Sequence, residues 1–316
     1  MVKFGLDLTI WPWEYETFDE IVEIAQLAES LGVDSLWMSD HLMYTTPNVG
    51  SLEVFAALAA VAAKTRNVVL GTKVVCAPIR HPGLLARAGT TLDIISGGRF
   101  VLGIGTGWFK AEFDAFGFPF EKRFERMRET VEIIRKSWTQ PVVDYEGKYY
   151  TIRGAVSLPL PVQKPHPPIW IGSQGPRMLR LTAELGDGWV IPNQSVEDYR
   201  QKWEFIKEKA RKVGRTASDI EPAHYAYASL SSSSNQAWRY AKDLILPERR
   251  RALNPGLTLK EVGDICLIGD PDEWVTRINE YIEAGAEHII VKIVPLTQEA
   301  LCLYGEKVIP HFGKNT

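Results

Sequence analysis

Residues 68–107, VVLGTKVVCAPIRHPGLLARAGTTLDIISGGRFVLGIGTG, contain two apolar runs on either side of a helical segment. The runs VVLGTKVV (68–75) and RFVLGIGTG (99–107) are predicted to be strands, and His81–Ile95 a helix that stops at Ser96-Gly97-Gly98. Strands rich in valine and isoleucine are typical of a parallel sheet that is buried on both faces. This stretch therefore predicts a β-α-β unit.

The same alternation continues along the chain in both directions. Further strands are expected in VKFGLDLT, DSLWMSDH, PIWIGSQGP, DGWVIPN, EPAHYAYASL and HIIVKIV. Further helices are expected over 18–31, 52–64, 120–138, 178–185, 196–213, 273–284 and 298–309. Eight strands that alternate with helices predict an α/β fold, the (β/α)8 TIM barrel, with residues 1–316 as a single domain. An open Rossmann-like sheet is the alternative, and the strand count and length favour the barrel.

Two segments interrupt the alternation and are predicted to be insertions in the barrel. Residues 139–168 contain an expected hairpin that turns at Glu146-Gly147, followed by the proline-rich SLPLPVQKPHPP. Residues 231–271 are expected to form a less regular helical segment. Both are too short to be domains, so we expect loops and lids.

The composition of the 316-residue chain is that of an ordinary globular protein, with 45% hydrophobic and 24% charged residues. A net charge of −3 gives no reason to expect nucleic acid or an anionic membrane as a partner. The amino-terminal MVKFGLDLTIW resembles a strand rather than a signal peptide, and no apolar run approaches the roughly 18 residues of a membrane span. Three widely separated cysteines argue against disulfides. The expected compartment is the cytoplasm.

Candidate functional residues follow the strands, because the active face of such a barrel is built from the loops after the strands. Trp11 and Trp13 follow the first strand and are expected either to wall a flat aromatic ligand or to pack within a loop. Asp40 and His41 follow the second strand and suit hydrogen bonding to a heterocycle and proton transfer. The alternative is that Asp40 caps the next helix and His41 is merely exposed.

The third and fourth strands end in residues that suit a ligand or the core. Arg80 is expected to hold an anion or to form a structural salt bridge, and Cys76 to lie in the core. The segment Gly103–Trp108 superficially resembles the dinucleotide fingerprint, but Trp108 stands at the third glycine position. Glycines at a barrel rim instead allow a ring or backbone to approach closely. Glu112 is a candidate acid, with solvated surface as the alternative.

The later strands offer an anion site and isolated polar residues. Small residues with free amides open the helix after the fifth strand, which predicts a phosphate site at Gly172–Pro176. Asn193 is expected to add a polar contact, and Lys292 to meet an anionic group or reach the rim. His224 and His288 are expected to have internal partners.

Other catalytic patterns are missing from the sequence. There is no HExxH, Cys/His cluster, GxSxG or GxxxxGK[ST] motif, so no metal site is expected. An isomerase or aldolase is the least supported class, because no lysine or second carboxylate stands out at the strand ends.

At six places in order the sequence resembles the bacterial-luciferase-like superfamily of flavin-dependent monooxygenases and coenzyme F420-dependent reductases. These are the SDH after strand two, LGTKVV with RHP, LDIISGGRFVLGIGTGW, PIWIGSQGP, AELGDGWVIPN and DPDEWVTRINEYIEAGAEHIIV. The resemblance implies the (β/α)8 fold, a homodimer, and a flavin or deazaflavin at the barrel mouth. It also implies a non-proline cis peptide behind the ring, which we place at Lys73-Val74.

The resemblance assigns roles to residues of this chain. Asp40 would contact the deazaflavin, and His41, together with Asp40, would form the catalytic pair. The expected cofactor-binding residues are Asp40, Lys73, Val74, Gly105, Thr106, Gly107, Gly172, Ser173, Gln174, Gly175 and Asn193. The expected substrate pocket is formed by Trp11, Trp13, Trp108 and Glu112. Sugar-phosphate dehydrogenases of the family have a glutamate where this chain has Trp108, so a more apolar small-molecule substrate is expected.

The predicted function is a coenzyme F420-dependent oxidoreductase that transfers a hydride between the deazaflavin and a small organic substrate. The alternative is an FMN-dependent monooxygenase that uses reduced flavin and O2, with a flavin or F420 reductase as partner. A third hypothesis is a non-catalytic flavin-binding barrel. Whether His41 or Glu112 moves the proton is left open by the sequence.

Overall fold

Eight parallel strands close into a barrel in the computed structural model, which describes residues 1–9, 17–42 and 50–313. The barrel strands are β1 (Lys3–Asp7), β2 (Ser35–Met38), β3 (Val69–Thr72), β5 (Phe100–Gly105), β8 (Ile169–Gly172), β9 (Gly188–Pro192), β10 (Glu221–Leu230) and β12 (His288–Ile293). They pair in this order, and β12 returns to β1 with Lys3 opposite His288. The predicted barrel is confirmed, and the open sheet is wrong.

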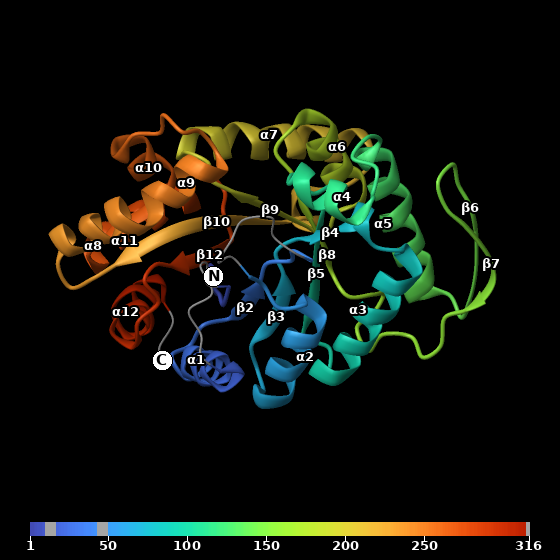
Figure 1. Ribbon diagram of the computed structural model, residues 1–316, viewed down its shortest axis with the longest axis horizontal. Coiled ribbons are helices and arrows are strands. Elements are labelled where there is room, and N and C mark those ends of the chain that lie inside the picture. The colour runs from blue at the N-terminus through green and yellow to red at the C-terminus, as the bar shows by residue number, and fades with distance from the viewer. Residues whose placement is uncertain (10–16, 43–49, 314–316) are drawn as a thin grey trace.

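Helices surround the barrel and alternate with its strands, as Figure 1 shows. They are α1 (Phe18–Ser30), α2 (Val54–Lys64), α3 (Pro82–Ser96), α5 (Arg123–Thr139), α6 (Pro176–Leu185), α7 (Val196–Lys212), α11 (Pro271–Glu283) and α12 (Gln298–Leu303). Local chemistry sets several ends: Asp270 caps α11, and Gly97 ends α3 in the left-handed conformation that glycine adopts most easily.

Alternate residues of each strand face the helices or the barrel interior. Phe4, Leu6 and Leu8 of the first strand and its extension pack in the core shared with the helices. Trp37 and Trp170 pack instead in the interior cluster, with ring centroids 4.8 Å apart. The interior is therefore filled by side chains, and it leaves the strand ends as the surfaces where ligands can bind.

The structure interrupts the run predicted as a continuous third strand. β3 ends at Thr72, the Lys73-Val74 peptide is cis, and the chain resumes as β4 (Val75–Cys76). The cis peptide implied by the family resemblance is thus confirmed in its predicted place. The uninterrupted strand is wrong, because β5 pairs with β3 and β4 in two separate registers.

The connection between β5 and β8 also differs from the prediction. A short helix, α4 (Lys110–Phe116), precedes α5 and was not predicted. α5 begins at Arg123 rather than Phe120, after Lys122 with a φ of 59°. This crossover brings Glu112 to the barrel mouth, by which we mean the carboxyl-terminal ends of the eight strands.

Two further segments contain elements that are not part of the eight-stranded barrel. The first contains a hairpin of β6 (Val142–Glu146) and β7 (Thr151–Val156), which projects away from the barrel in Figure 1. The second contains α8 (Ser234–Tyr240), a π-helical turn (Ala241–Ile245), α9 (Leu246–Ala252) and α10 (Leu259–Ile265). It also contains an unpredicted strand, β11 (Leu267–Gly269), that pairs with the end of β10.

The part of the chain that the structure describes has no helix long and apolar enough to cross a membrane.

Candidate active site

A buried network of charged and polar side chains lies where β1, β3 and β10 reach the barrel mouth. Lys73 Nζ lies 3.0 Å from Asp7 Oδ2 and donates to Ser39 Oγ at 3.1 Å. The Tyr225 hydroxyl donates to the same Asp7 oxygen at 3.0 Å, and the ammonium lies 3.6 Å from the Tyr225 ring centroid. Burial lowers the pKa of Lys73, and Asp7 opposes that change. These contacts fix the residue that precedes Val74.

Val74 fills a space left by glycines of the neighbouring strands. A Cβ added to Gly105 would lie 2.8 Å from Val74 Cγ2, and one added to Gly172 would lie 3.0 Å from it. A Cβ on Gly107, which has a φ of +72°, would lie 2.4 Å from Cys76 Sγ. The sequence predicted that a ring or backbone would approach the rim glycines. In the structure, the groups next to Gly105 and Gly107 are the side chains of Val74, between β3 and β4, and of Cys76.

We expect Gly105→Ala to lower the free energy of unfolding by about 1–3 kcal/mol, because the new methyl group would overlap Val74. The measurement is urea unfolding followed by circular dichroism. Gly175→Ala is the control, since a Cβ there meets nothing within 4 Å and the backbone φ is −82°. Equal stability of the two variants would contradict the tight packing of Val74.

Asp40 is buried and paired with Arg80 in the same part of the mouth. Both terminal nitrogens of Arg80 donate to the Asp40 carboxylate, and Cys76 N–H donates to Oδ2 at 3.2 Å. Burial raises the pKa of Asp40, and the guanidinium opposes the rise. The structural salt bridge considered for Arg80 is confirmed. The helix-capping alternative for Asp40 is wrong, because Glu53 caps α2.

Cys76 lies in the core, as the sequence predicts. Its side chain packs with Ile79 and Phe113. Burial raises the pKa of the thiol to about 12, so it stays protonated. A thiolate nucleophile at this position is therefore not expected.

His41 contacts Glu112 across the mouth. His41 Nδ1 lies 3.2 Å from Glu112 Oε2, and Leu42 N–H donates to Oε1 at 2.6 Å. Glu112 is only 2% exposed. The solvated-surface alternative for Glu112 is wrong, because α4 turns this side chain towards the loop after β2.

Aromatic rings flank His41. Trp108 and Phe109 both meet the imidazole edge to face, with centroids 6.1 Å and 6.3 Å away. Trp108 remains 59% exposed, which makes it an apolar surface at the site entrance. Trp11 and Trp13, also expected in the substrate pocket, lie outside the described residues.

The predicted phosphate segment lies at the amino terminus of α6. Gly175 caps the helix and Pro176 is its first residue. Ser173 is buried and bonds Thr182 through their hydroxyl groups at 2.9 Å, whereas Gln174 and Gly175 are exposed. The helix therefore presents backbone N–H groups to solvent beside an unobstructed glycine, which is an arrangement that favours anions.

A second set of cations lies near Asn193, on the other side of the network. Arg249 donates to Asn193 Oδ1 at 3.2 Å, and its guanidinium lies 3.6 Å from the ring centroid of Tyr227. Lys292 lies 4.9 Å from the same ring and is buried, so of its two alternatives the one at the rim is wrong, and contact with an anionic group stays a prediction. Sequence reasoning missed Arg249, because nothing in its insertion marks one arginine as buried.

Asp7 and Tyr225 were missed as well. Asp7 could have been noticed, since a carboxylate that ends a buried strand is expected to have a partner. Thr106 follows β5 at the mouth and is half-buried.

The contacts described above bring five of the predicted site residues to one end of the barrel: Asp40, His41, Glu112, Lys73 and Val74.

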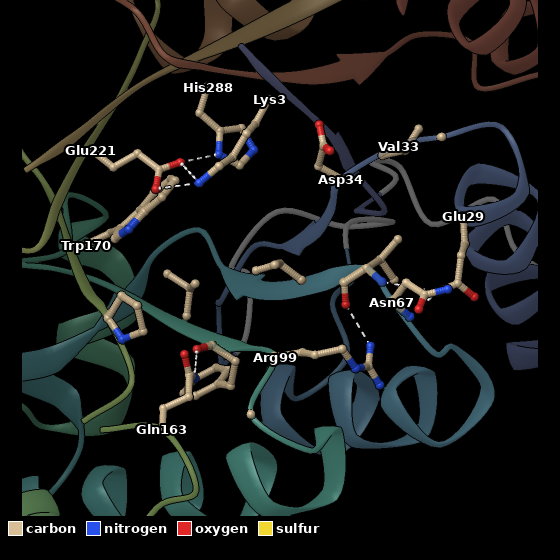
Figure 2. A pocket seen from close by; sticks show the side chains of 17 residues that line it. Lys3, Glu29, Val33, Asp34, Asn67, Arg99, Gln163, Trp170, Glu221 and His288 are labelled. Carbon is tan, nitrogen blue, oxygen red and sulfur yellow. Dashed lines mark hydrogen bonds and ion pairs between the residues drawn. The ribbon is translucent and has the colours of Figure 1, made fainter. Parts of the chain in front are cut away.

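A cavity of about 540 Å³ opens at the opposite end of the barrel. Figure 2 shows Lys3, Glu221 and His288 pointing towards one another in it. His288 also contacts Ser35 Oγ at 2.7 Å, so its predicted internal partners are confirmed. These polar groups bind one another, and the cavity lies at the amino ends of the strands. The barrel mouth is therefore the candidate active site.

The described residues contain no group of three or more His, Cys, Asp or Glu side chains placed to hold a metal ion.

Comparisons with known proteins agree with this geometry. A 5,10-methylenetetrahydromethanopterin reductase of Archaeoglobus fulgidus is 32% identical and is matched over 98% of this chain and 99% of its own length. An F420-dependent glucose-6-phosphate dehydrogenase of Microbacterium testaceum is 29% identical, with 94% of both chains covered. The solved F420-dependent tetrahydromethanopterin reductase of Methanopyrus kandleri superposes with a TM-score of 0.83 at 26% identity, over 98% of this chain and 99% of that one.

The family model described as luciferase-like monooxygenase matches residues 6–288. This match covers most of the chain: it includes the barrel strands from β2 to β10, the end of β1 and the first residue of β12. The chain therefore belongs to the luciferase-like monooxygenase family.

Proposed function

We propose that this protein is a coenzyme F420-dependent oxidoreductase that transfers a hydride between the deazaflavin and a small organic substrate. The observation that carries the proposal is the His41–Glu112 pair, a proton-transfer group beside the Val74 segment at the barrel mouth. The relatives support the choice of cofactor, because both the reductase of known structure and the glucose-6-phosphate dehydrogenase are named as F420-dependent.

The residues at the mouth fit such a cofactor. Val74 would support one face of the ring. The ion pair of Lys73 with Asp7 fixes the residue before it, and its side chain packs against Gly105 of β5 and Gly172 of β8. The amino terminus of α6 would hold the cofactor phosphate at Gly172–Gly175. Gly105, Thr106, Gly107 and Asn193 would line the remaining edge. Bound F420 would supply hydride transfer at its ring.

The protein itself moves the accompanying proton. His41 is the side chain suited to that step, because it lies at the mouth with a carboxylate on one ring nitrogen. Asp40 fixes the start of the same loop through Arg80 and Cys76. We therefore assign proton transfer to His41 and support of the loop to Asp40, whose contact with the cofactor stays a prediction from the family resemblance.

Trp108 limits what the substrate can be. It stands edge-on to His41 with more than half of its surface exposed, so it presents an apolar wall beside the reacting group. Such a wall favours apolar small molecules over sugar phosphates.

We expect Trp108→Ala to raise KM for an apolar substrate about tenfold while kcat changes little, because the lost contact binds substrate and transition state alike. Steady-state kinetics with an apolar substrate that turns over with F420 measure this. Trp108→Phe is the conservative control and should lie close to the wild type. A fall in kcat with unchanged KM would place Trp108 in the chemical step instead.

The alternative is an FMN-dependent monooxygenase, which the description of the family model favours. It would need reduced flavin from a reductase partner and O2 as oxidant. We further propose that residues 1–316 work as a single domain in a cytoplasmic homodimer, and sedimentation equilibrium would test the dimer.

Paired titration with F420 and with FMN, each oxidised and reduced, tests the proposed function. Micromolar binding of F420 with FMN at least tenfold weaker, about 1.4 kcal/mol, is the expected result. The opposite preference would overturn the deazaflavin mechanism and favour oxygen chemistry. Binding of neither would remove the cofactor proposal and leave the family fold alone.

A further inference from the structure

Glu112 holds two adjacent residues of the loop after β2 with its two oxygens. Oε1 accepts a hydrogen bond from Leu42 N–H at 2.6 Å, and Oε2 lies 3.2 Å from His41 Nδ1. The carboxylate reaches them from α4, 70 residues away in the sequence, and both side chains are buried. An ionised carboxylate has no hydrogen to donate. With Oε1 already accepting from Leu42 N–H, the contact at Oε2 favours a ring proton on Nδ1.

We propose that Glu112 is a positioning residue that fixes His41 in the Nδ1–H tautomer and so leaves Nε2 without a proton in the neutral ring. The proton-transfer atom of this protein is then Nε2, and Glu112 itself transfers no proton. The catalytic meaning of this inference rests on the proposed function, whereas the tautomer is a property of the chain alone.

The rings around His41 support a single orientation of the imidazole. Trp108 and Phe109 meet it at interplanar angles of 85° and 76°. Rotation of the imidazole by half a turn would place a carbon against Glu112 Oε2 and lose a hydrogen bond to a charged group. The arrangement therefore fixes both the tautomer and the face of the ring that points away from Glu112.

An unprotonated Nε2 suits a substrate that gives up or takes up one proton as the hydride moves, and an alcohol and carbonyl pair is the simplest such substrate. In oxidation, the hydroxyl proton passes to Nε2 while the carbinol carbon gives its hydride to oxidised F420, and the C–O bond becomes a carbonyl. In reduction, the imidazolium returns that proton to the carbonyl oxygen as the hydride comes back from reduced F420. Glu112 transfers no proton in either direction, and its contact with Nδ1 is kept when the ring becomes an imidazolium.

The first test is the tautomer of His41 in the wild-type full chain without cofactor. The chain has six histidines, so two-bond proton–nitrogen spectra of a sample with ¹⁵N-labelled histidine resolve few signals. The signals that disappear in His41→Gln identify His41. At neutral pH we expect the pattern of a protonated Nδ1 and an unprotonated Nε2. A proton on Nε2 would overturn the proposal without any variant of Glu112.

The second test exchanges the acceptor for a donor at nearly constant volume. In Glu112→Gln, the amide oxygen is needed by Leu42 N–H, so the amide NH2 faces Nδ1 and drives the ring proton to Nε2. We expect the reversed tautomer and a loss of at least about 100-fold in kcat with unchanged affinity for F420. An unchanged tautomer in Glu112→Gln would overturn the proposal.

Asp114→Asn is the matched control. It removes the same charge from the same short helix, but Asp114 is exposed and paired only with Lys110 among the described residues. We expect wild-type tautomer and wild-type kcat for this variant. If Asp114→Asn also reversed the tautomer, the effect would belong to the charge or stability of α4 rather than to the Glu112 contact.

Failure of this inference can be told apart from failure of the proposed function. A tautomer that depends on Glu112 in a protein that binds no F420 would support the inference and overturn the function. Turnover of alcohols with F420 by a protein whose His41 carries its proton on Nε2 would support the proposed function and overturn the inference. The alcohol class itself fails if F420 turnover occurs only with substrates that have no hydroxyl or carbonyl group.

Discussion

His41→Gln is expected to lower kcat with F420 and an alcohol substrate by about 1,000-fold, while the dissociation constant of F420 changes less than about threefold. General acid–base catalysis by a positioned side chain contributes roughly 100- to 10,000-fold, and glutamine cannot exchange a proton near neutral pH. Glutamine can still occupy the space between Trp108 and Glu112, so the mouth should keep its shape. Stopped-flow absorbance of the deazaflavin measures the hydride step, and fluorescence titration measures binding.

His311→Gln is the control for this prediction, because it removes an exposed histidine far along the chain at its carboxyl end. It should retain wild-type kcat. If His41→Gln kept more than about a third of the activity, His41 would not be the proton-transfer group. If His41→Gln and Asp40→Asn left every turnover unchanged while F420 still bound, the non-catalytic flavin-binding barrel would be the better hypothesis.

The barrel could be predicted from the sequence because its signals are local. Alternating apolar strands and helices are visible residue by residue, and several helix ends have their own markers, such as Asp270 before α11 and Gly97 after α3. The candidate pair Asp40–His41 was found for the same reason. A polar pair directly after a buried strand must lie at the mouth of a barrel, whatever the rest of the fold does.

The burial of Glu112 could not be predicted from the sequence. Its helix has only seven residues and no side-chain cap, since Phe109 occupies the capping position. The one local marker of α4 is Gly117 after its last residue, which does not indicate where the helix begins or which face is buried. The carboxylate was therefore as compatible with the surface as with the site. Its burial against His41 depends on contacts between segments about 70 residues apart, which no local pattern encodes.

Arg249 and the Lys73 network show the same limit for buried charges. Three arginines follow one another at 249–251, and only the packing of α9 against Tyr227 decides that the first is buried. Lys73 was assigned to the site through family resemblance, but its partners Asp7 and Tyr225 come from the first and seventh barrel strands. Pairing of charges across a closed barrel is a property of the tertiary structure.

His224 is a correction with a consequence for stability. It was expected to have internal partners, yet both ring nitrogens are buried without a hydrogen-bond partner in the described structure. The imidazole faces the helices from β10 and stacks on Tyr281, with centroids 3.8 Å apart, while Tyr199 packs edge-on at 5.5 Å. It therefore behaves as an aromatic core residue. Burial, with a smaller contribution from Arg277, lowers the pKa of His224 from 6.5 to about 3.

The direction of the pH effect follows from this lowered pKa. Between pH 6.5 and about 3 the unfolded chain binds a proton at residue 224 that the folded chain does not bind. Stability is therefore lost as the pH falls through this window, by about 1.4 kcal/mol per pH unit once it is well below 6.5. Above that window the group contributes nothing to the pH dependence.

We expect His224→Phe to remove this loss, because phenylalanine keeps the stacking on Tyr281 and cannot bind a proton. At pH 7 the variant should be as stable as the wild type or slightly more stable, since two unpartnered nitrogens disappear. Between pH 7 and 4.5 its advantage should grow by about 3 kcal/mol in urea unfolding experiments. His311→Phe removes an exposed histidine instead and should run parallel to the wild type. Parallel curves for His224→Phe would show that this imidazole is protonated in the folded protein, with a water molecule or a rearranged partner that satisfies it.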